Sequence, residues 1–489
     1  MRQITLLSLL LLFLAACGVQ KRSFDVQPSR IEIQEDYLSV SEDSLFDSAQ
    51  PVVEWWQQFN DPVLDTLIAR GRTNNLTVNT AVANLFAARA ALKGTKLDRL
   101  PTVTANGSYQ RQRLGQNLFI TEGNPTFDQY NTSLDATWES NLFGRVSNRV
   151  RAAYASQQAA QEEMKAAYTS IFSEIARNYL ELRGTQYQLN IAQRNLKDQQ
   201  HTYDLVNEIY TAGTGNSLDV ARALAQLDNT KATIPPLLAR TEALKNSLSV
   251  LIGELPGSLD LAVVDPKPLP DLPATVLVGN GVDLLRRRPD VQQAEQELTQ
   301  HIAQYNLSVA ELYPSVRFGG SIGFSAINFS KLGQGESFSW NILPSINWAA
   351  FNLGRVKRQI DQQDALTLAA LNRYEQTVLQ ALEEIKTAMS NYSNELERRE
   401  ILRQSSQSSA EAVQLAQKRY QAGLDNFIDY LNADRTLLEA ENELAISETT
   451  SATYLVGIYK ALGGGWEHIS DEEVKHKYER LKLADGSLR

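Results

Sequence analysis

Two kinds of hydrophobic periodicity alternate along the chain. Apolar positions recur about every 3.6 residues over 61–99 and again over 289–312, which predicts an amphipathic helix in each stretch. Each helical pattern stops at a proline, and the period then changes to two. The alternation of apolar and polar residues predicts one strand hairpin over 101–139 and a second over 314–349.

The four predicted strands each have one apolar and one polar face. Val316, Phe318 and Ile322, for example, alternate with polar or glycine positions. Each strand is roughly 10 to 13 residues long, which suits a tilted strand that crosses a membrane. Four strands cannot close a barrel with a lumen, and an open sheet edge cannot face lipid. If the strands cross a membrane, the chain therefore has to oligomerise; the alternative is two polar hairpins packed on a helical body in water.

A long helical hairpin is predicted after each pair of strands, over residues 144–253 and 354–463. No proline interrupts the first 70 residues of either stretch. A helix of roughly 70 residues would be about 100 Å long. Such a helix is too long for a compact globule.

Glycines mark the turn of each helical hairpin. Gly213 and Gly423 can adopt the left-handed geometry that ends a helix. We expect Asn216-Ser217 or Asp425-Asn426 to cap the returning helix. Pro235-Pro236 lies inside the first returning helix and predicts a break or kink there, because proline removes a backbone donor. The second hairpin has no proline at the corresponding position.

Landmark residues recur at a constant offset. Trp138 recurs as Trp348, and the glycine at 213 recurs at 423, a spacing of 210 residues in both cases (348 − 138 = 423 − 213 = 210). This period is far longer than the roughly 20 to 50 residues of a solenoid repeat, and it indicates a duplicated half-molecule in which each repeat is one structural unit. The expected organisation is a first repeat over 61–255, a connector over 256–288, a second repeat over 289–466 and a polar C-terminal tail over 467–489.

The N-terminus carries an expected targeting segment. Residues 1–16 combine Arg2 with a short apolar stretch and a small-residue site before Cys17, the only cysteine in the chain. This arrangement resembles a bacterial lipoprotein signal peptide. We expect Cys17, bearing N-palmitoyl and S-diacylglycerol groups, to head an N-terminal segment over 17–60; the alternative is an ordinary signal peptide with an incidental cysteine. Gly18, rather than aspartate, favours delivery to the outer membrane.

Composition and motifs argue against several functional classes. A content of 43% hydrophobic and 21% charged residues is ordinary for a folded protein, and a net charge of −10 argues against nucleic-acid binding. The four histidines are scattered, and the nucleophile-elbow, P-loop and dinucleotide motifs do not occur. We therefore expect a protein that is not an enzyme and that uses no metal and no cofactor beyond the covalent lipid.

Four motifs resemble those of the TolC-like outer-membrane efflux proteins, the outer membrane factor family, and within it the lipoprotein branch that includes OprM. They are RRRPDVQQAE (286–295), LYPSV (312–316), NLGRV (352–356) and YKALGGGW (459–466). The resemblance implies a mainly α fold with a β-barrel contribution, in which a trimer closes a 12-stranded outer-membrane barrel above a helical periplasmic tunnel. The implied partners are a homotrimer, a periplasmic adaptor protein, an inner-membrane efflux pump of the RND type and outer-membrane lipid.

The resemblance also implies a gate at the tip of the second helical hairpin. Its positions in this chain are Tyr420, Ile428, Asp429, Asn432 and Arg435. One Asp429 per chain would form a ring of carboxylates, which favours cations at a constriction, and Arg435 or Tyr420 would hold the gate closed by bonding to a neighbouring helix. Relatives carry aspartate where this chain has Asn432, so one ring of charge is missing.

Each gate residue also has a simpler interpretation. Asp429 can be a solvated acid that complements the helix dipole, and Arg435 can be an ordinary surface arginine. Asp219 and Arg222 occupy the corresponding positions in the first hairpin (429 − 210 = 219; 432 − 210 = 222). Asp219 is better explained as a solvated acid, because the resemblance implies that the first hairpin packs outside the pore.

These features predict a passive exit duct for drugs or other small toxic compounds, driven by the inner-membrane pump. We expect it in the outer membrane of a Gram-negative bacterium, lipid-anchored, with most of its mass in the periplasm. The alternatives are a duct for metal-ion efflux or type I protein secretion and, in a different class, a lipid-anchored periplasmic coiled-coil scaffold. A duct leaves specificity to the pump, so the sequence does not identify the substrate.

Overall fold

The computed structural model describes residues 22–23, 45–113, 126–259, 265–279 and 285–484. The chain divides into two compact units. Unit 1 combines residues 1–31, 85–160 and 293–375, and unit 2 combines residues 32–84, 161–292 and 376–489. Each unit contains parts of both repeats, so the two compact units do not coincide with the two predicted repeats. The reason is that strands of the two repeats pair in unit 1, and helices of the two repeats pack together in unit 2.

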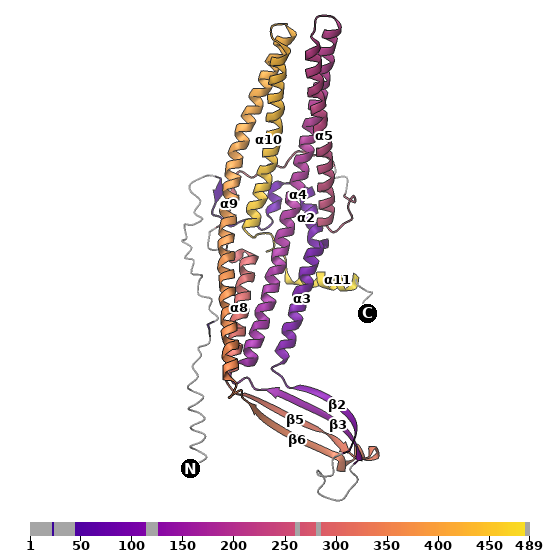
Figure 1. Cartoon of the computed structure of the whole chain (residues 1–489), viewed down its shortest axis with the longest axis vertical. Coiled ribbons are helices and arrows are strands. Elements are labelled where there is room, and N and C mark those ends of the chain that lie inside the picture. The colour runs from indigo at the N-terminus through magenta and orange to yellow at the C-terminus, as the bar shows by residue number, and fades with distance from the viewer. Residues whose placement is uncertain (1–21, 24–44, 114–125, 260–264, 280–284, 485–489) are drawn as a thin grey trace. The chain divides into compact units, whose positions relative to one another are not determined.

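Unit 1 contains one antiparallel sheet built by both repeats (Figure 1). Its strands are β2 (Thr102–Arg113), β3 (Thr126–Glu139), β5 (Ser315–Ala326) and β6 (Phe338–Asn347). They lie in the order β2-β3-β5-β6, so both predicted strand hairpins are confirmed, and β3 and β5 join them. Within the described chain β2 and β6 each have one hydrogen-bonded neighbour. Both edges of the sheet are therefore open in a single chain.

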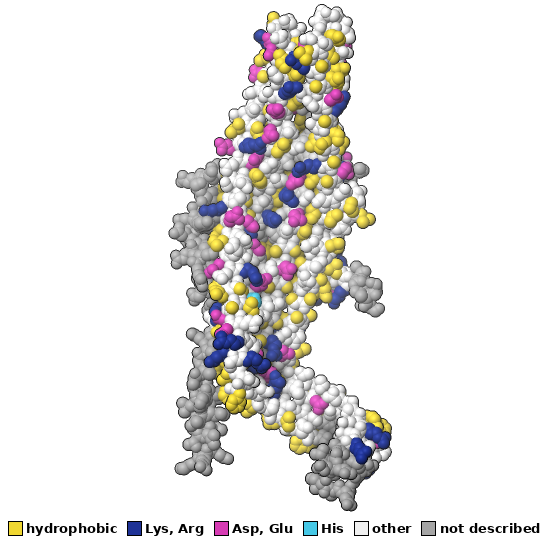
Figure 2. All heavy atoms as spheres, viewed as in Figure 1, with side chains coloured by type: hydrophobic (Ala, Val, Ile, Leu, Met, Phe, Trp, Pro, Cys, Tyr) yellow, Lys and Arg dark blue, Asp and Glu magenta, His cyan; other side chains and the backbone are white. Residues whose placement is uncertain are grey.

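The register of the sheet puts the predicted apolar positions on one face. An apolar row crosses all four strands at Ala105, Leu134, Ile322 and Trp340. The adjacent row faces the other way and is polar, with Thr104, Asp135, Ser321 and Asn341. Leu134, Ile322 and Trp340 are 52%, 51% and 66% exposed, so the chain leaves this apolar face uncovered. Figure 2 shows charged side chains spread along the helices and few on the visible part of the sheet.

A tryptophan at the end of a strand in each repeat holds the polypeptide that leaves the preceding helix. Trp138 Nε1 donates to the carbonyl oxygen of Arg99 (3.1 Å), and Trp348 Nε1 donates to that of Leu312 (2.9 Å). Carbonyl groups at or just beyond a helix C-terminus lack an intrahelical donor, and the indole supplies one. The two tryptophans recur 210 residues apart because they perform the same structural task.

The helices before the strands are α2 (Pro62–Asn74), α3 (Leu76–Leu97) and α8 (Pro289–Ala310). The second of the two predicted stretches is confirmed as a single helix, whereas the first is broken at Asn75. The Asn75 side chain accepts a hydrogen bond from Val78 N–H (3.0 Å) and donates one to the Leu251 carbonyl oxygen (2.8 Å). These bonds compete with the regular helical pattern and start a new helix.

Both long helical hairpins are present as predicted (Figure 1). They consist of α4 (Arg145–Thr211) with α5 (Ser217–Leu251), and α9 (Leu353–Gln421) with α10 (Phe427–Ala461). The prediction at Pro235-Pro236 is a break or a kink; the helix α5 is continuous through both prolines, so no break occurs. Both prolines are exposed, and solvent can hydrate the backbone carbonyls that lose their donors. No helix within the described ranges is both long and apolar enough to cross a membrane.

The segment expected as a polar tail contains the helix α11 (Asp471–Ala484). Its Val474 and Lys477 are buried in unit 2. Lys477 Nζ donates to the carbonyl oxygen of Arg72, and Arg72 Nε donates to Glu473 of the same helix (2.7 Å). This part of the tail is therefore packed structure. The remaining elements are β1 (Phe46–Asp47), which pairs with β4 (Val276–Leu277), and the 3₁₀ helices η2 (Trp55–Phe59), η4 (Phe329–Lys331) and η5 (Gly335–Ser337).

The RRRPD motif forms a buried polar contact in unit 2. The Arg288 side chain is 7% exposed. Its Nη1 donates to the carbonyl oxygen of Ala461 at the end of α10 (2.7 Å), and its Nη2 donates to Glu384 of α9 (2.6 Å). The same guanidinium pairs with Asp290 (3.0 and 2.8 Å). Arg288 thus ties the start of α8 to both helices of the second hairpin.

Candidate functional site

Both hairpin tips have the same backbone geometry. Gly213 and Gly423 adopt the left-handed conformation, with φ angles of 82° and 72°. In each tip the residue after the glycine donates its N–H to the carbonyl oxygen five residues earlier, at 3.3 Å in the first tip and 2.9 Å in the second. This is the pattern of a glycine-terminated helix. The predicted glycine turns are confirmed.

The helices that return from the tips begin differently. Asn216 accepts a hydrogen bond from Leu218 N–H (3.0 Å), as predicted. Asn426 occupies the cap position of α10 but makes no side-chain cap hydrogen bond. Asp425 instead binds Arg419 in a bidentate pair (2.5 and 2.8 Å). In the second tip an ion pair across the turn therefore replaces the predicted cap.

Most of the predicted gate positions lie in the first three turns of α10. The buried side of these turns packs on both helices of the first hairpin through Phe427, Tyr430, Leu431, Val206 and Ala223. Asp429, Asn432 and Arg435 are exposed, and Ile428 is half-buried at the edge of that core. Packing of the apolar side of α10 thus sets the direction in which its exposed polar side faces.

Asp429 lies in the first turn of α10. A carboxylate there complements the positive end of the helix dipole. Its side chain has no hydrogen-bond or ion-pair partner within the residues that the structure describes. Asn432 is exposed one turn later. This placement is compatible with both interpretations of Asp429, as a solvated acid or as one member of a charged ring.

The two residues predicted to hold the gate closed differ in their contacts. Arg435 Nε donates to Gln226 Oε1 of α5 (2.8 Å), so this arginine links the second hairpin to the first within one chain. Tyr420 of α9 packs its ring against those of Phe427 (5.6 Å between centroids) and Tyr430 (6.4 Å). The tyrosine therefore contributes aromatic packing to the tip.

The counterparts of the gate in the first hairpin form a pair. The Arg222 guanidinium lies 3.3 Å from the Asp219 carboxylate, one turn away on α5. Burial raises the pKa of Tyr420, and the negative charge of Asp219 raises it further. Asp219 is thus a partly buried acid beside the second hairpin, which the interpretation as a solvated acid does not describe.

A polar seam joins α4 to α10 below the tips. The hydroxyl oxygens of Thr202 and Tyr430 lie 3.1 Å apart. Further along, Gln199 Nε2 donates to a carboxylate oxygen of Asp434. Arg194 Nη2 then donates to Glu441 (2.8 Å). Separating the two hairpins would break each of these contacts.

Asp434 is the residue of this seam that sequence reasoning missed. Burial raises its pKa to about 6; the charges of Asp198 and Glu441 also raise it, while Gln199 and Arg435 oppose the rise. A carboxyl group at a contact between hairpins thus titrates close to neutral pH. The available signal was position, because Asp434 follows Tyr430 by one turn on the packed side of α10.

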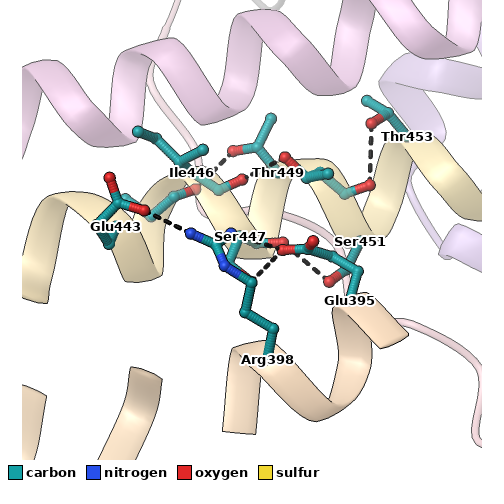
Figure 3. Close-up of polar contacts among 10 residues, drawn as sticks. Glu395, Arg398, Glu443, Ile446, Ser447, Thr449, Ser451 and Thr453 are labelled. Carbon is teal, nitrogen blue, oxygen red and sulfur yellow. Dashed lines mark hydrogen bonds and ion pairs between the residues drawn. The ribbon is translucent and has the colours of Figure 1, made fainter. Parts of the chain in front are cut away.

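Polar contacts hold α9 against α10 in the stem of the second hairpin (Figure 3). Arg398 donates to Glu443 across the stem (2.5 Å) and to Glu395 on its own helix (3.1 Å). Ser447 Oγ donates back to Glu395 (2.5 Å). Ser447 and Ser451 are fully buried, and their small side chains leave room for a close approach of the helices. The stem therefore fixes the position of the tip.

Cys17, the predicted lipidation site, lies outside the described residues. Within the described ranges no group of three or more His, Cys, Asp or Glu side chains is placed to hold a metal ion. What the structure does bring together is a set of contacts between the two hairpins of one chain.

Comparisons with known proteins agree with one another. The family model described as outer membrane efflux protein matches residues 67–254 and 281–464. The chain is 28% identical to the antibiotic efflux pump outer membrane protein ArpC of Pseudomonas putida, over 84% of this chain and 85% of that protein. The toluene efflux pump outer membrane protein TtgC of Pseudomonas putida matches with the same identity and coverage. The solved structure of the outer-membrane channel OprN superimposes with a TM-score of 0.86 and 35% identity, over 92% of this chain and 99% of that chain.

Proposed function

The chain belongs to the outer membrane efflux protein family and is an outer-membrane efflux channel, and on that premise we propose that it is a passive exit duct for drugs or other small toxic compounds. Three copies form the duct. An inner-membrane pump of the RND type supplies the energy, and a periplasmic adaptor joins the pump to the duct. Passive conduction requires no chemical step from this chain.

The sheet of unit 1 is the observation that supports this proposal most directly. One of its faces is apolar and exposed, and β2 and β6 are open edges in the described chain. Every backbone polar group in hydrocarbon must be paired, so such edges cannot face lipid. Pairing β6 of one copy with β2 of the next removes every edge. Three copies of four strands give twelve, enough for a barrel with a lumen.

The names of the relatives support small toxic compounds as the substrate class. Two relatives of equal identity to this chain are named for antibiotic efflux and for toluene efflux. A duct that does not select its cargo accounts for this difference, because specificity then belongs to the pump.

The proposed anchor is a lipid on Cys17. The chain has no other cysteine, and this one follows Leu14-Ala15-Ala16 at the end of an apolar stretch. Acylation with N-palmitoyl and S-diacylglycerol groups would hold the N-terminus in the outer membrane. Two or more acyl chains are needed for stable anchoring.

Bilayer recording tests the duct. Protein extracted in detergent is expected to migrate as a trimer that heat converts to monomers, and to conduct ions in planar bilayers. Acylation is expected to disappear in the Cys17→Ser variant. Water-soluble monomers without conductance after this substitution would contradict the duct and favour the lipid-anchored scaffold.

The gate proposal predicts that Asp429→Ala lowers the preference of the channel for cations. Three carboxylates at roughly 8 Å from a permeating ion in water contribute about 1 to 1.5 kcal/mol, or about a five- to tenfold preference. Reversal potentials in a salt gradient measure this preference. The Asn432→Asp variant should raise it by adding a second ring.

The matched control for Asp429 is Asp228→Ala. Asp228 is an exposed acid of the first hairpin that pairs with Lys231 on its own helix (3.7 Å). We expect the selectivity of this variant to equal that of the wild type. If Asp429→Ala behaves in the same way, Asp429 is a solvated acid at a helix end.

A further inference from the structure

A short segment after the proposed lipidation site binds to unit 1. Arg22 N–H donates to Asn306 Oδ1 (2.9 Å), and Asn306 Nδ2 donates to the carbonyl oxygen of Arg22 (3.0 Å). One side chain of α8 therefore satisfies both backbone groups of Arg22, as a neighbouring strand would. Asn306 is 1% exposed. Without Arg22 this amide would lose both of these hydrogen-bond partners.

The side chain of Arg22 adds contacts with charge and with an aromatic ring. Its Nη2 donates to Asp364 Oδ1 of α9 (2.6 Å), and its guanidinium carbon lies 5.2 Å from the centre of the Tyr305 ring. Both side chains of the ion pair are partly exposed, and such pairs contribute little alone. A carboxylate beside an aromatic face does, however, select arginine.

The residues next to these contacts form a well-packed hydrophobic cluster. Tyr305 belongs to a buried cluster that joins α8 to α9, with Val309, Leu312, Val356 and Ile360. Asp364 follows Ile360 by one turn of α9. Tyr305 is thus held by this cluster, Asn306 is its neighbour on α8, and Asp364 follows the cluster on α9.

We propose that Tyr305, Asn306 and Asp364 form a receptor site for Arg22, and that this site keeps the acylated N-terminus of each chain beside its own strands. The proposal rests on the proposed lipidation of Cys17. Arg22 follows that cysteine by five positions (22 − 17 = 5), so Cys17 stays within about 18 Å of the site even when the chain is fully extended.

The strands lie within a similar reach of the receptor site. The helix α8 continues for four residues beyond Asn306 (310 − 306 = 4), and β5 begins at Ser315. This path spans at most about 25 Å. With Arg22 held at the site, the acylated Cys17 therefore stays close enough for its lipid to enter the membrane near the strands of the same chain.

Among the described residues, the carboxylate of the receptor site has no counterpart at the equivalent position of the first repeat. Asp364 corresponds to Tyr154 in the first repeat (364 − 210 = 154), where no carboxylate is available. One site per chain matches one N-terminus per chain. The proposed lipid anchor therefore explains why the second repeat has Asp364 where the first has Tyr154.

Trypsin tests the receptor site, because it must take the arginine side chain into its own pocket. In the full-length, acylated protein in detergent, we expect slow cleavage after Arg22, read by mass spectrometry as the product that begins at Ser23. Asn306→Ala should accelerate this cleavage about tenfold, because two hydrogen bonds are lost. Asp364→Asn, which preserves shape, should accelerate it by a smaller factor.

The control is Asp361→Asn on the same helix. Asp361 pairs with Arg358 (3.0 Å), and its loss should leave the cleavage rate after Arg22 unchanged. Circular dichroism and trimer migration verify that the variants are folded. Fast cleavage of the wild type, or equal rates in wild type and Asn306→Ala, would overturn the site. The intact mass reports acylation separately, so protection of Arg22 in a chain without lipid would retain the site and reject the anchor.

Discussion

Alanine in place of Arg288 is expected to lower the free energy of unfolding by about 3 kcal/mol. The guanidinium is buried and donates to the Ala461 carbonyl oxygen, to Glu384 and to Asp290. Without it the carbonyl loses its donor, and the space above Gly463 loses the arginine stem. A urea titration followed by the helical circular dichroism signal measures the change.

Two further variants distinguish the effect of losing this buried network from the effect of losing one positive charge. Arg286 is exposed two positions earlier in the same motif, and Arg286→Ala should change the unfolding free energy by less than about 0.5 kcal/mol. Arg288→Lys should give an intermediate loss, because one ammonium cannot match the fork that faces three acceptors. Equal urea midpoints for the two alanine variants would show that the Arg288 network does not stabilise the fold.

Replacement of Asp434 by asparagine is expected to make the contact between the two hairpins independent of pH. In the packed hairpins, burial and then the charges of Asp198 and Glu441 raise the pKa of Asp434 to about 6. Because the folded-state pKa is raised, the stabilising contribution is complete below about pH 4 and is lost as the pH rises through about 6. The wild-type contact should therefore weaken between pH 5 and pH 7. The stabilisation lost over the whole titration is at most about 3 kcal/mol. Solvent screening reduces this loss, because the site is half-buried.

Hydrogen–deuterium exchange over residues 427–440 measures this contact at pH 5 and pH 7, after correction for the intrinsic exchange rate. The wild type should exchange faster at pH 7, and Asp434→Asn should exchange equally slowly at both. The control is Asp204→Asn, an exposed acid of α4 that bonds to Gln200 (2.9 Å), which should retain the wild-type dependence. If Asp434→Asn also retains it, Asp434 is not the source of the pH dependence.

Periodicity predicted the strands and long helices well, and the sequence prediction failed at two places. It missed the break at Asn75, because the partner that stabilises the break, Leu251, is distant in the sequence. It also predicted a break or kink at Pro235-Pro236, and the helix continues through both prolines without a break. The effect of proline depends on whether solvent reaches the backbone of the preceding turn, which a pattern of residue types does not report.

The candidate site was predictable in position but not in its partners. The turn glycines and the start of α10 were placed correctly, because helix ends have local chemical signals. The partner of Arg435 is 209 residues away at Gln226, and that of Asp434 is 235 residues away at Gln199. Neither pair could be chosen from the spacing of residues on a single helix.

Which residues share a face can be read from the amino-acid pattern, since both strand alternation and helical periodicity arise within one element. The pattern also shows the turns and, through the 210-residue offset, the corresponding residues of the two repeats. The pairing of polar groups depends on the three-dimensional fold, which brings together Asp434 with Gln199, Arg288 with Ala461, and Arg22 with Asn306. The reason is that a buried polar group is stabilised by the partner that the fold brings to it, and that partner is set by the packing of distant elements.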